Sequence, residues 1–134
     1  MKLSCLVLSL TACATGSIGT DRDVAPRTGI HLQLAPAKDA TRVFPSVIDP
    51  SLPSADRLAH HVRMRFGEAV EAELDLCVVP NGTVASAKLA APTGYDALDA
   101  AIERDAASWK FEAMPGPASV QSCERARLTY RAPR

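Results

Sequence analysis

Apolar side chains recur every four residues near the middle of the chain, at Leu58, Val62 and Phe66. This spacing places them on one side of an α-helix. Ser54 precedes the repeat as a plausible N-cap, and Gly67 follows it as a residue that tolerates positive φ. The pattern predicts a helix over residues 55–66.

A strict alternation of apolar and polar positions follows, over residues 72–79 and again over 83–90. Alternation sends successive side chains to opposite faces of a strand, and Pro80-Asn81-Gly82 between the two runs suits a tight turn. The two runs therefore predict a β-hairpin. We expect its apolar face to carry Leu74, Leu76, Val78, Ala85, Ala87 and Leu89, and its polar face Glu73, Asp75, Cys77, Ser86 and Lys88.

A second helical stripe and a last strand complete the pattern. The stripe joins Leu98, Ile102, Ala106 and Trp109, and it predicts a helix that Asp96 caps and that ends at Trp109. The strand spans residues 123–131, with Ala126, Leu128 and Tyr130 on one face and Cys123, Arg125, Arg127, Thr129 and Arg131 on the other. The order α-β-β-α-β predicts an α+β fold, with a three-stranded antiparallel sheet covered by helices on one face.

The N-terminal part of the chain shows neither period. Residues 14 to about 50 are rich in proline and glycine, with one short extended piece expected at residues 30–34. We interpret this part as a tether. The predicted division is an export signal over 1–12, a tether over 13–52 and a folded domain over 53–134.

The first residues have the composition of an export signal. Lys2 precedes an apolar run over residues 3–10, far shorter than the roughly 20 residues of a membrane-spanning helix. Leu10-Thr11-Ala12-Cys13 then resembles a lipobox, whose cysteine becomes the lipid-modified N-terminus. Ala14, where Asp would signal inner-membrane retention, indicates the outer membrane. We therefore expect Cys13 to anchor the protein at the periplasmic face of the cell envelope, the alternative being an ordinary cleaved signal with a chance cysteine.

The cysteines divide into two groups. Cys5 lies in the predicted signal and Cys13 is the lipidation candidate, which leaves Cys77 and Cys123 as an even pair in an oxidising compartment. Both fall on the polar faces of their predicted strands, so they can meet if the strands are neighbours. We predict a disulfide; two free thiols or half of a metal site are the alternatives.

Several segments together resemble the C-terminal domain of the TonB family. The hairpin Val78-Val79-Pro80-Asn81-Gly82-Thr83-Val84 is similar to that family's strand-turn-Val segment. Residues 93–101, Thr-Gly-Tyr-Asp-Ala-Leu-Asp-Ala-Ala, look like its S-G-x-x-x-L-D-x-A segment. Residues 108–113, Ser-Trp-Lys-Phe-Glu-Ala, match its x-W-[RK]-[FY]-x-P signature except that Ala113 replaces the usual Pro, and Leu128-Thr129-Tyr130-Arg131 resembles the closing strand. The resemblance covers residues 72–131.

The resemblance implies a binding role. Members of the family transduce energy from an inner-membrane motor to outer-membrane receptors, whose segments pair with an exposed last strand by β-augmentation. This sequence departs from the family in having neither the transmembrane helix nor the long proline-rich rod. We expect a non-catalytic protein that binds an envelope protein or an extended peptide. The alternatives are a genuine energy-transducing transport component and a structural, self-associating envelope subunit.

Charge and catalytic patterns add little. Fifteen basic and fifteen acidic residues balance, so no global field favours nucleic acid. Phosphate-binding loops, HExxH and G-x-S-x-G patterns are missing from the sequence, and we expect no cofactor, no metal and no small-molecule substrate. His60 and His61 point about 100° apart on a helix and chelate poorly together.

The last strand is the predicted binding edge. No strand follows it in the chain, so its unpaired backbone groups are expected to accept an incoming strand. We predict that Arg125, Arg127, Thr129 and Arg131 form this site and that the arginines favour an acidic partner. The alternative is that these arginines only keep the edge soluble.

Overall fold

The computed structural model describes residues 29–34 and 44–134. The predicted signal over 1–12, the lipidation candidate Cys13 and much of the predicted tether lie outside these residues. Nine helices and strands are described, in the order β1 (Ile30–Leu34), β2 (Val47–Ile48), α1 (Pro53–Asp56), α2 (Ala59–Phe66), β3 (Val70–Val78), β4 (Val84–Ala91), α3 (Asp96–Ala106), β5 (Lys110–Phe111) and β6 (Ser122–Tyr130).

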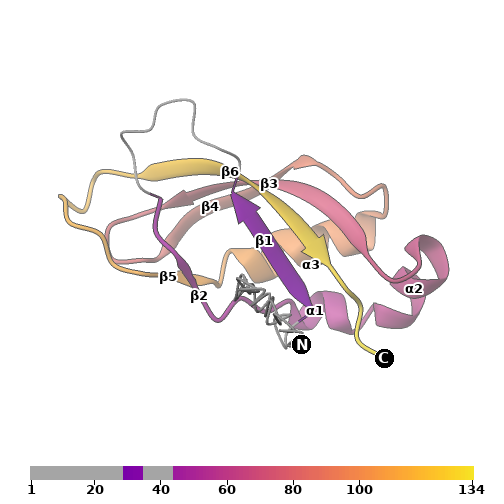
Figure 1. The fold of residues 1–134 in the computed structure, drawn as a ribbon. Coiled ribbons are helices and arrows are strands. Elements are labelled where there is room, and N and C mark those ends of the chain that lie inside the picture. The colour runs from indigo at the N-terminus through magenta and orange to yellow at the C-terminus, as the bar shows by residue number, and fades with distance from the viewer. Residues whose placement is uncertain (1–28, 35–43) are drawn as a thin grey trace, which may run out of the picture.

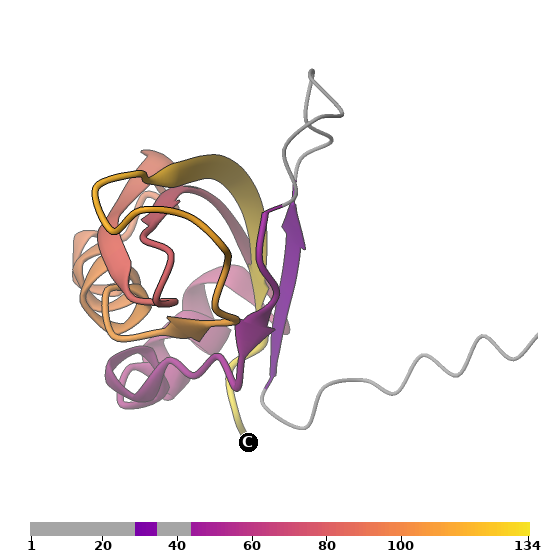
Figure 2. The same ribbon diagram turned by 90° about the vertical axis from the view of Figure 1, so that its left-hand side faces the viewer.

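The main sheet has four strands in the order β1-β6-β3-β4, and each neighbouring pair is antiparallel. β3 and β6 pair along their full length, from Val70 opposite Tyr130 to Val78 opposite Ser122. A second, two-stranded sheet joins β2 to β5. Figures 1 and 2 show the main sheet as an arch from β4 to β1, with the helices on its concave side. The α+β class with antiparallel sheets is therefore confirmed, and the sheet has one strand more than predicted.

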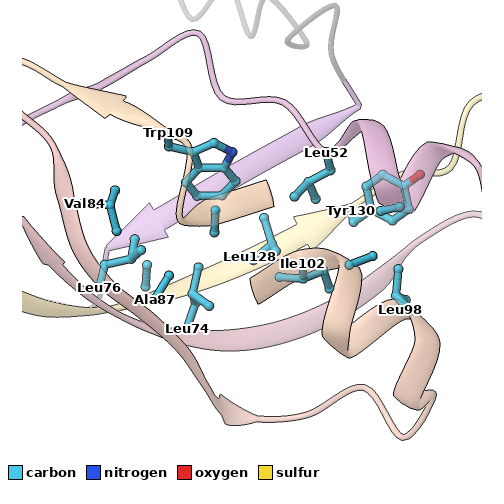
Figure 3. Packing of buried hydrophobic residues seen from close by; sticks show 14 of the residues in the cluster. Leu52, Leu74, Leu76, Val84, Ala87, Leu98, Ile102, Trp109, Leu128 and Tyr130 are labelled. Carbon is cyan, nitrogen blue, oxygen red and sulfur yellow. The ribbon is translucent and has the colours of Figure 1, made fainter. Parts of the chain in front are cut away.

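The hydrophobic core lies between the concave face of the sheet and the helices (Figure 3). Period-two alternation sends the apolar residues of β3 and β6 to this face, and the helical stripe of α3 meets them there. Completely or almost completely buried are Leu74, Leu76, Val78, Leu98, Ile102, Ala126, Leu128 and Tyr130. These residues are the predicted apolar faces of β3, α3 and β6, which are confirmed.

The folded unit begins before the predicted boundary at Pro53. Leu52 is only 1% exposed, and Phe44 and Val47 pack against the core. β1 and β2 also precede that boundary. The proposed tether therefore contains parts of the fold, and the extended piece expected at residues 30–34 is strand β1.

The first predicted helix is two helices, α1 and α2, separated by Arg57 and Leu58. Ser54, the expected N-cap, lies inside α1. The backbone N–H of Ser54 donates to Asp105 Oδ2 at 2.7 Å. The helix starts earlier because Pro53, with its fixed φ and no N–H to leave unpaired, occupies the first turn. Gly67 ends α2 with φ 81°, the positive φ that the sequence predicted.

β4 reverses its side-chain parity at a bulge. Cys77 lies opposite Ser86, but Val78 lies opposite Val84, so Ala85 is the extra residue. One extra residue sends two successive side chains outward, and Ala85 is exposed while Val84 and Ala87 are buried. The predicted inward position of Ala85 is wrong for this reason.

The second predicted helix is shorter, and Asp96 does not cap it: Tyr95 is at the N-cap position and makes no side-chain cap hydrogen bond. α3 ends at Ala106, three residues before Trp109, which lies in the connection to β5. Near the start of α3, the side chain of Asp99 points towards Thr93, which precedes the helix. Asp99 Oδ1 accepts hydrogen bonds from the backbone N–H and the hydroxyl of Thr93, at 2.9 and 2.6 Å. This pairing satisfies donors ahead of the helix that would otherwise lack partners.

Candidate strand-addition site on β6

The structure brings three of the four predicted binding residues together on one face of β6. Arg125 and Arg127 are exposed and Thr129 is partly exposed, whereas the intervening Ala126 and Leu128 are buried. Arg131 is exposed and lies just beyond the end of the strand. The side chains of these four residues project from the convex face of the sheet and not from its edge. A strand added to β6 would therefore pair with the backbone of these residues and not with their side chains.

β6 is not the free edge that the sequence predicted. β1 pairs with it in antiparallel register, from Ile30 opposite Tyr130 to Leu34 opposite Ala126. The prediction was wrong because it considered only segments that follow the last strand. An extended segment that precedes the domain in sequence can add to the same edge, since strand pairing depends on backbone groups and not on chain order.

The β1–β6 pairing begins at Gly29. The backbone N–H of Arg131 donates to the Gly29 carbonyl at 2.6 Å, and Gly29 has φ 66°. A Cβ at this position would lie 2.5 Å from the Arg131 carbonyl oxygen, so only glycine fits without displacement. Because hydrogen-bonded pairs alternate along an antiparallel ladder, His31 opposite Thr129 and Gln33 opposite Arg127 are the next hydrogen-bonded pairs.

The opposite edge of the sheet, β4, is obstructed by the protein's own chain. The Glu103 side chain of α3 accepts the outward backbone N–H of Leu89 at 2.9 Å, and it also forms an ion pair with Lys88 at 3.4 Å. At the other end of the strand, Thr83 forms a β-bridge with Lys110 of β5. Together with the bulge at Ala85, these contacts leave little regular backbone on β4 for another strand.

The convex face of the sheet carries paired charges. Arg125 donates from Nε and a terminal nitrogen to the two carboxylate oxygens of Asp75, at 2.7 and 3.0 Å. This hydrogen bonding lowers the pKa of the Asp75 carboxyl from its usual value. Arg127 lies opposite Glu73 in register, and Lys88 opposite Asp75. Arg125 is therefore engaged within the domain, and Arg127 is the better placed of the two for an incoming carboxylate.

The predicted disulfide is confirmed. Cys77 and Cys123 lie directly opposite each other on β3 and β6, with an S–S distance of 2.06 Å and a sequence separation of 46 residues. The bond lies on the convex face, as the parity of the two strands predicted. It ties β6 to β3 at the end of the sheet that β1 does not cover.

Two buried polar groups escaped the sequence prediction because their partners are distant along the chain. Asp105 is 7% exposed and accepts the Ser54 N–H, which joins α3 to α1. The Tyr130 hydroxyl donates to Asp56 at 2.7 Å. Burial first, and the hydrogen bond to Asp56 second, raise the pKa of Tyr130 well above its usual value. The first hydrogen bond joins two helices and the second joins α1 to β6, and neither pair follows from a regular spacing in the sequence.

Trp109 is a core residue, as expected, and it borders a surface hollow. Its side chain is 4% exposed, and its indole N–H donates to the Ser51 carbonyl at 2.8 Å. The hollow, of about 370 Å³, also borders Asp105 and Lys110. Residues 29–34 and 44–134 contain no group of three or more side chains able to hold a metal ion. In the same residues, no helix has the length and apolar composition needed to cross a membrane.

Comparison of the chain with family models, with curated proteins and with solved structures gave no match.

Proposed function

We propose that this chain is a non-catalytic lipoprotein of the bacterial envelope, with a domain like the C-terminal domain of TonB, and that it binds an extended segment of a partner protein. The partner strand pairs with β6 in the place that β1 occupies. Cys13 holds the protein at the periplasmic face, at the outer membrane. The sequence segments that resemble the TonB family support the domain type, and the lipobox-like segment supports the anchor.

The pairing of β1 with β6 is the observation that carries this proposal. Five residues of β1 lie against five residues of β6 in unbroken register, so this edge accepts an extended strand. β1 is an edge strand that pairs with β6 alone among the described strands. A partner strand can offer β6 the same backbone hydrogen bonds as β1, but it must also overcome the advantage that β1 has in being part of the same chain.

The contacts that β6 makes with the rest of the domain hold it in place independently of β1. Its other side is paired with β3 over nine residues, and the disulfide joins the two strands. Its apolar side chains are buried in the core. Exchange at this edge therefore leaves the pairing of β6 with β3 in place, whereas addition at β4 would have to displace Glu103 and the bridge to β5.

The test uses the full chain, isolated with its anchor from cell envelopes, and two proline variants of β1. His31→Pro removes a backbone donor that faces β6. Leu32→Pro removes one that faces away from β6, because the N–H groups of non-hydrogen-bonded pairs point outward. We expect His31→Pro to weaken β1 and to increase the partner captured from envelopes, and Leu32→Pro to leave capture unchanged.

The same two variants can reject the proposal. If both substitutions abolish capture, the partner adds to the outer edge of β1 and not to β6. If capture is the same for the wild type and both variants, strand pairing at this edge is not the binding mode. Mass spectrometry of the mature N-terminus tests the anchor separately, since it should show a lipid-modified Cys13.

A further inference from the structure

A strongly basic segment follows α1. Residues 57–66 contain three arginines and two histidines and no acidic residue, although the chain as a whole has fifteen basic and fifteen acidic residues. The local excess of positive charge therefore belongs to one end of the molecule. Figure 1 shows this end, where α2 projects from the domain beside the start of β3.

The outward side of α2 combines these cations with one exposed apolar residue. Val62 is fully buried and fixes which side of the helix faces the core. His60, His61, Met64 and Arg65 are exposed, and at about 100° per residue they spread over roughly 140° of the helix surface, with Met64 between the two histidines. Met64 is 76% exposed, more than any other large apolar side chain among the described residues.

The C-terminal end of β6 adds cations to the same surface. Arg63 donates to the Pro133 carbonyl, and Arg63, Arg131 and Arg134 border one small hollow together with Glu68. We refer to Arg57, His60, His61, Arg63, Arg65 and Arg131 as the basic end. Acidic groups also lie here: Glu68 borders that hollow, and the Asp56 carboxylate accepts the Tyr130 hydroxyl. Arg65 donates to the Gly94 carbonyl at 2.9 Å, close in sequence to Asp96.

The chain joins the described fold at the basic end. Gly29, the first described residue, is hydrogen-bonded to Arg131. Residues 13–28 number sixteen, which limits the distance from Cys13 to Gly29 to about 55 Å even for a fully extended chain. A lipid at Cys13, which is part of the proposed function, would therefore hold Gly29, and the Arg131 beside it, within about 55 Å of the bilayer.

We propose that the basic end binds the surface of an anionic phospholipid membrane. Arginines interact with the phosphate headgroups, and Met64 enters the interface between headgroups and acyl chains. Basic residues near a negatively charged bilayer are attracted to it, and screening by salt weakens the attraction. The interaction orients the domain with α2 towards the bilayer.

The test removes the lipid and measures the surface alone. The chain from residue 13 onward, with Cys13→Ser, is sedimented with vesicles of phosphatidylcholine or of an equimolar mixture with phosphatidylglycerol. We expect binding to the mixed vesicles only, and weaker binding as salt is raised. Arg57→Gln combined with Arg63→Gln should weaken binding about 25-fold, from about fivefold for each arginine near the surface. Met64→Ser should weaken it at every salt concentration.

The matched control removes the same charge elsewhere. Lys88→Gln combined with Lys110→Gln alters two exposed cations of β4 and β5, and it should leave vesicle binding unchanged; circular dichroism establishes that each variant is folded. The proposal is overturned by absence of binding to the mixed vesicles, by equal binding to both vesicle types, or by equal losses in the control and the test pair. It is also overturned if soluble polyglutamate binds the basic end and the vesicles do not. Because no lipid anchor is present, these outcomes do not depend on whether Cys13 is lipidated.

Discussion

The two sides of the four-stranded sheet are closed in different ways. On the β4 side, Glu103 of α3 accepts the Leu89 N–H, and β5 bridges Thr83. Both closing elements are tied to the core, through Ile102 and through Phe111. On the β6 side, the closing element is β1, a strand of five residues at the edge of the sheet.

This difference supports the proposal that a partner strand is exchanged on the β6 side. Opening the β4 side requires α3 or β5 to move, and both carry buried apolar residues. Opening the β6 side requires the loss of one edge strand, while β6 keeps its pairing with β3 and its disulfide. Regions that open at low free energy are the ones that proteins use for binding. Substitutions in the shared core, on the β6 side and on the β4 side should have successively smaller effects.

Trp109→Ala should have the largest effect, because it damages the structure on which both sides depend. The indole is buried and its N–H donates to the Ser51 carbonyl. Truncation of a large buried aromatic residue costs about 3–5 kcal/mol, comparable to the stability of many small domains. Thermal unfolding followed by circular dichroism should show a large fall in the melting temperature. An unchanged melting temperature would be evidence against a core role.

Removal of the disulfide by Cys77→Ser with Cys123→Ser should come next. The bond joins residues separated by 46 positions, and the chain-entropy model assigns such a loop roughly 4 kcal/mol. Urea unfolding under oxidising conditions should give a lower midpoint for the double variant. A midpoint equal to that of the wild type would show that the bond does not constrain the unfolded chain.

Tyr130→Phe tests the end of β6 that pairs with β1. It removes the hydrogen bond to the Asp56 carboxylate, and hydrogen bonds to charged groups contribute about 1.5–3 kcal/mol. Folding raises the pKa of Tyr130 above its usual 10.0, so its stabilising contribution is complete below pH 10 and is lost as pH rises towards the folded value. The stability difference between wild type and Tyr130→Phe should therefore shrink above pH 10. A difference that is constant across the alkaline range would contradict this assignment.

Glu103→Ala should have a smaller effect, confined to the β4 side. The substitution leaves the Leu89 N–H without its acceptor, which costs about 1 kcal/mol. Lys88→Ala removes only an exposed ion pair and should cost less than about 0.5 kcal/mol. Urea unfolding of both variants separates the two contributions. Equal losses would mean that the ion pair, and not the capped backbone group, is the relevant contact.

The sequence predicted the elements whose burial imposes a period. β3, α3 and β6 each have one side against the core, so Leu74, Ile102 and Leu128 repeat at the spacing of their elements and reveal them. The disulfide followed from the shared polar faces of Cys77 and Cys123, on the condition that β3 and β6 are neighbours. These features could be predicted because they depend on residue type, which the sequence shows directly.

The pairing of β1 with β6 could not be predicted in the same way. Backbone hydrogen bonds hold the two strands together, and they leave little trace in residue type beyond Gly29. The closure of β4 by Glu103 and the link from Asp105 to Ser54 depend on backbone donors far away in sequence. The predicted binding residues were therefore placed on the correct strand and face, but the state of the edge beside them was wrong.

Covalent locking of β1 to β6 tests the central claim most directly. His31 lies opposite Thr129 in the register, so His31→Cys with Thr129→Cys should form a second disulfide between the strands. The affinity of the full chain for its envelope partner is then measured for the locked variant and for each single variant, without reductant. If the partner takes the place of β1, the locked variant loses binding while both single variants keep it. Wild-type affinity in the fully locked variant would contradict the claim.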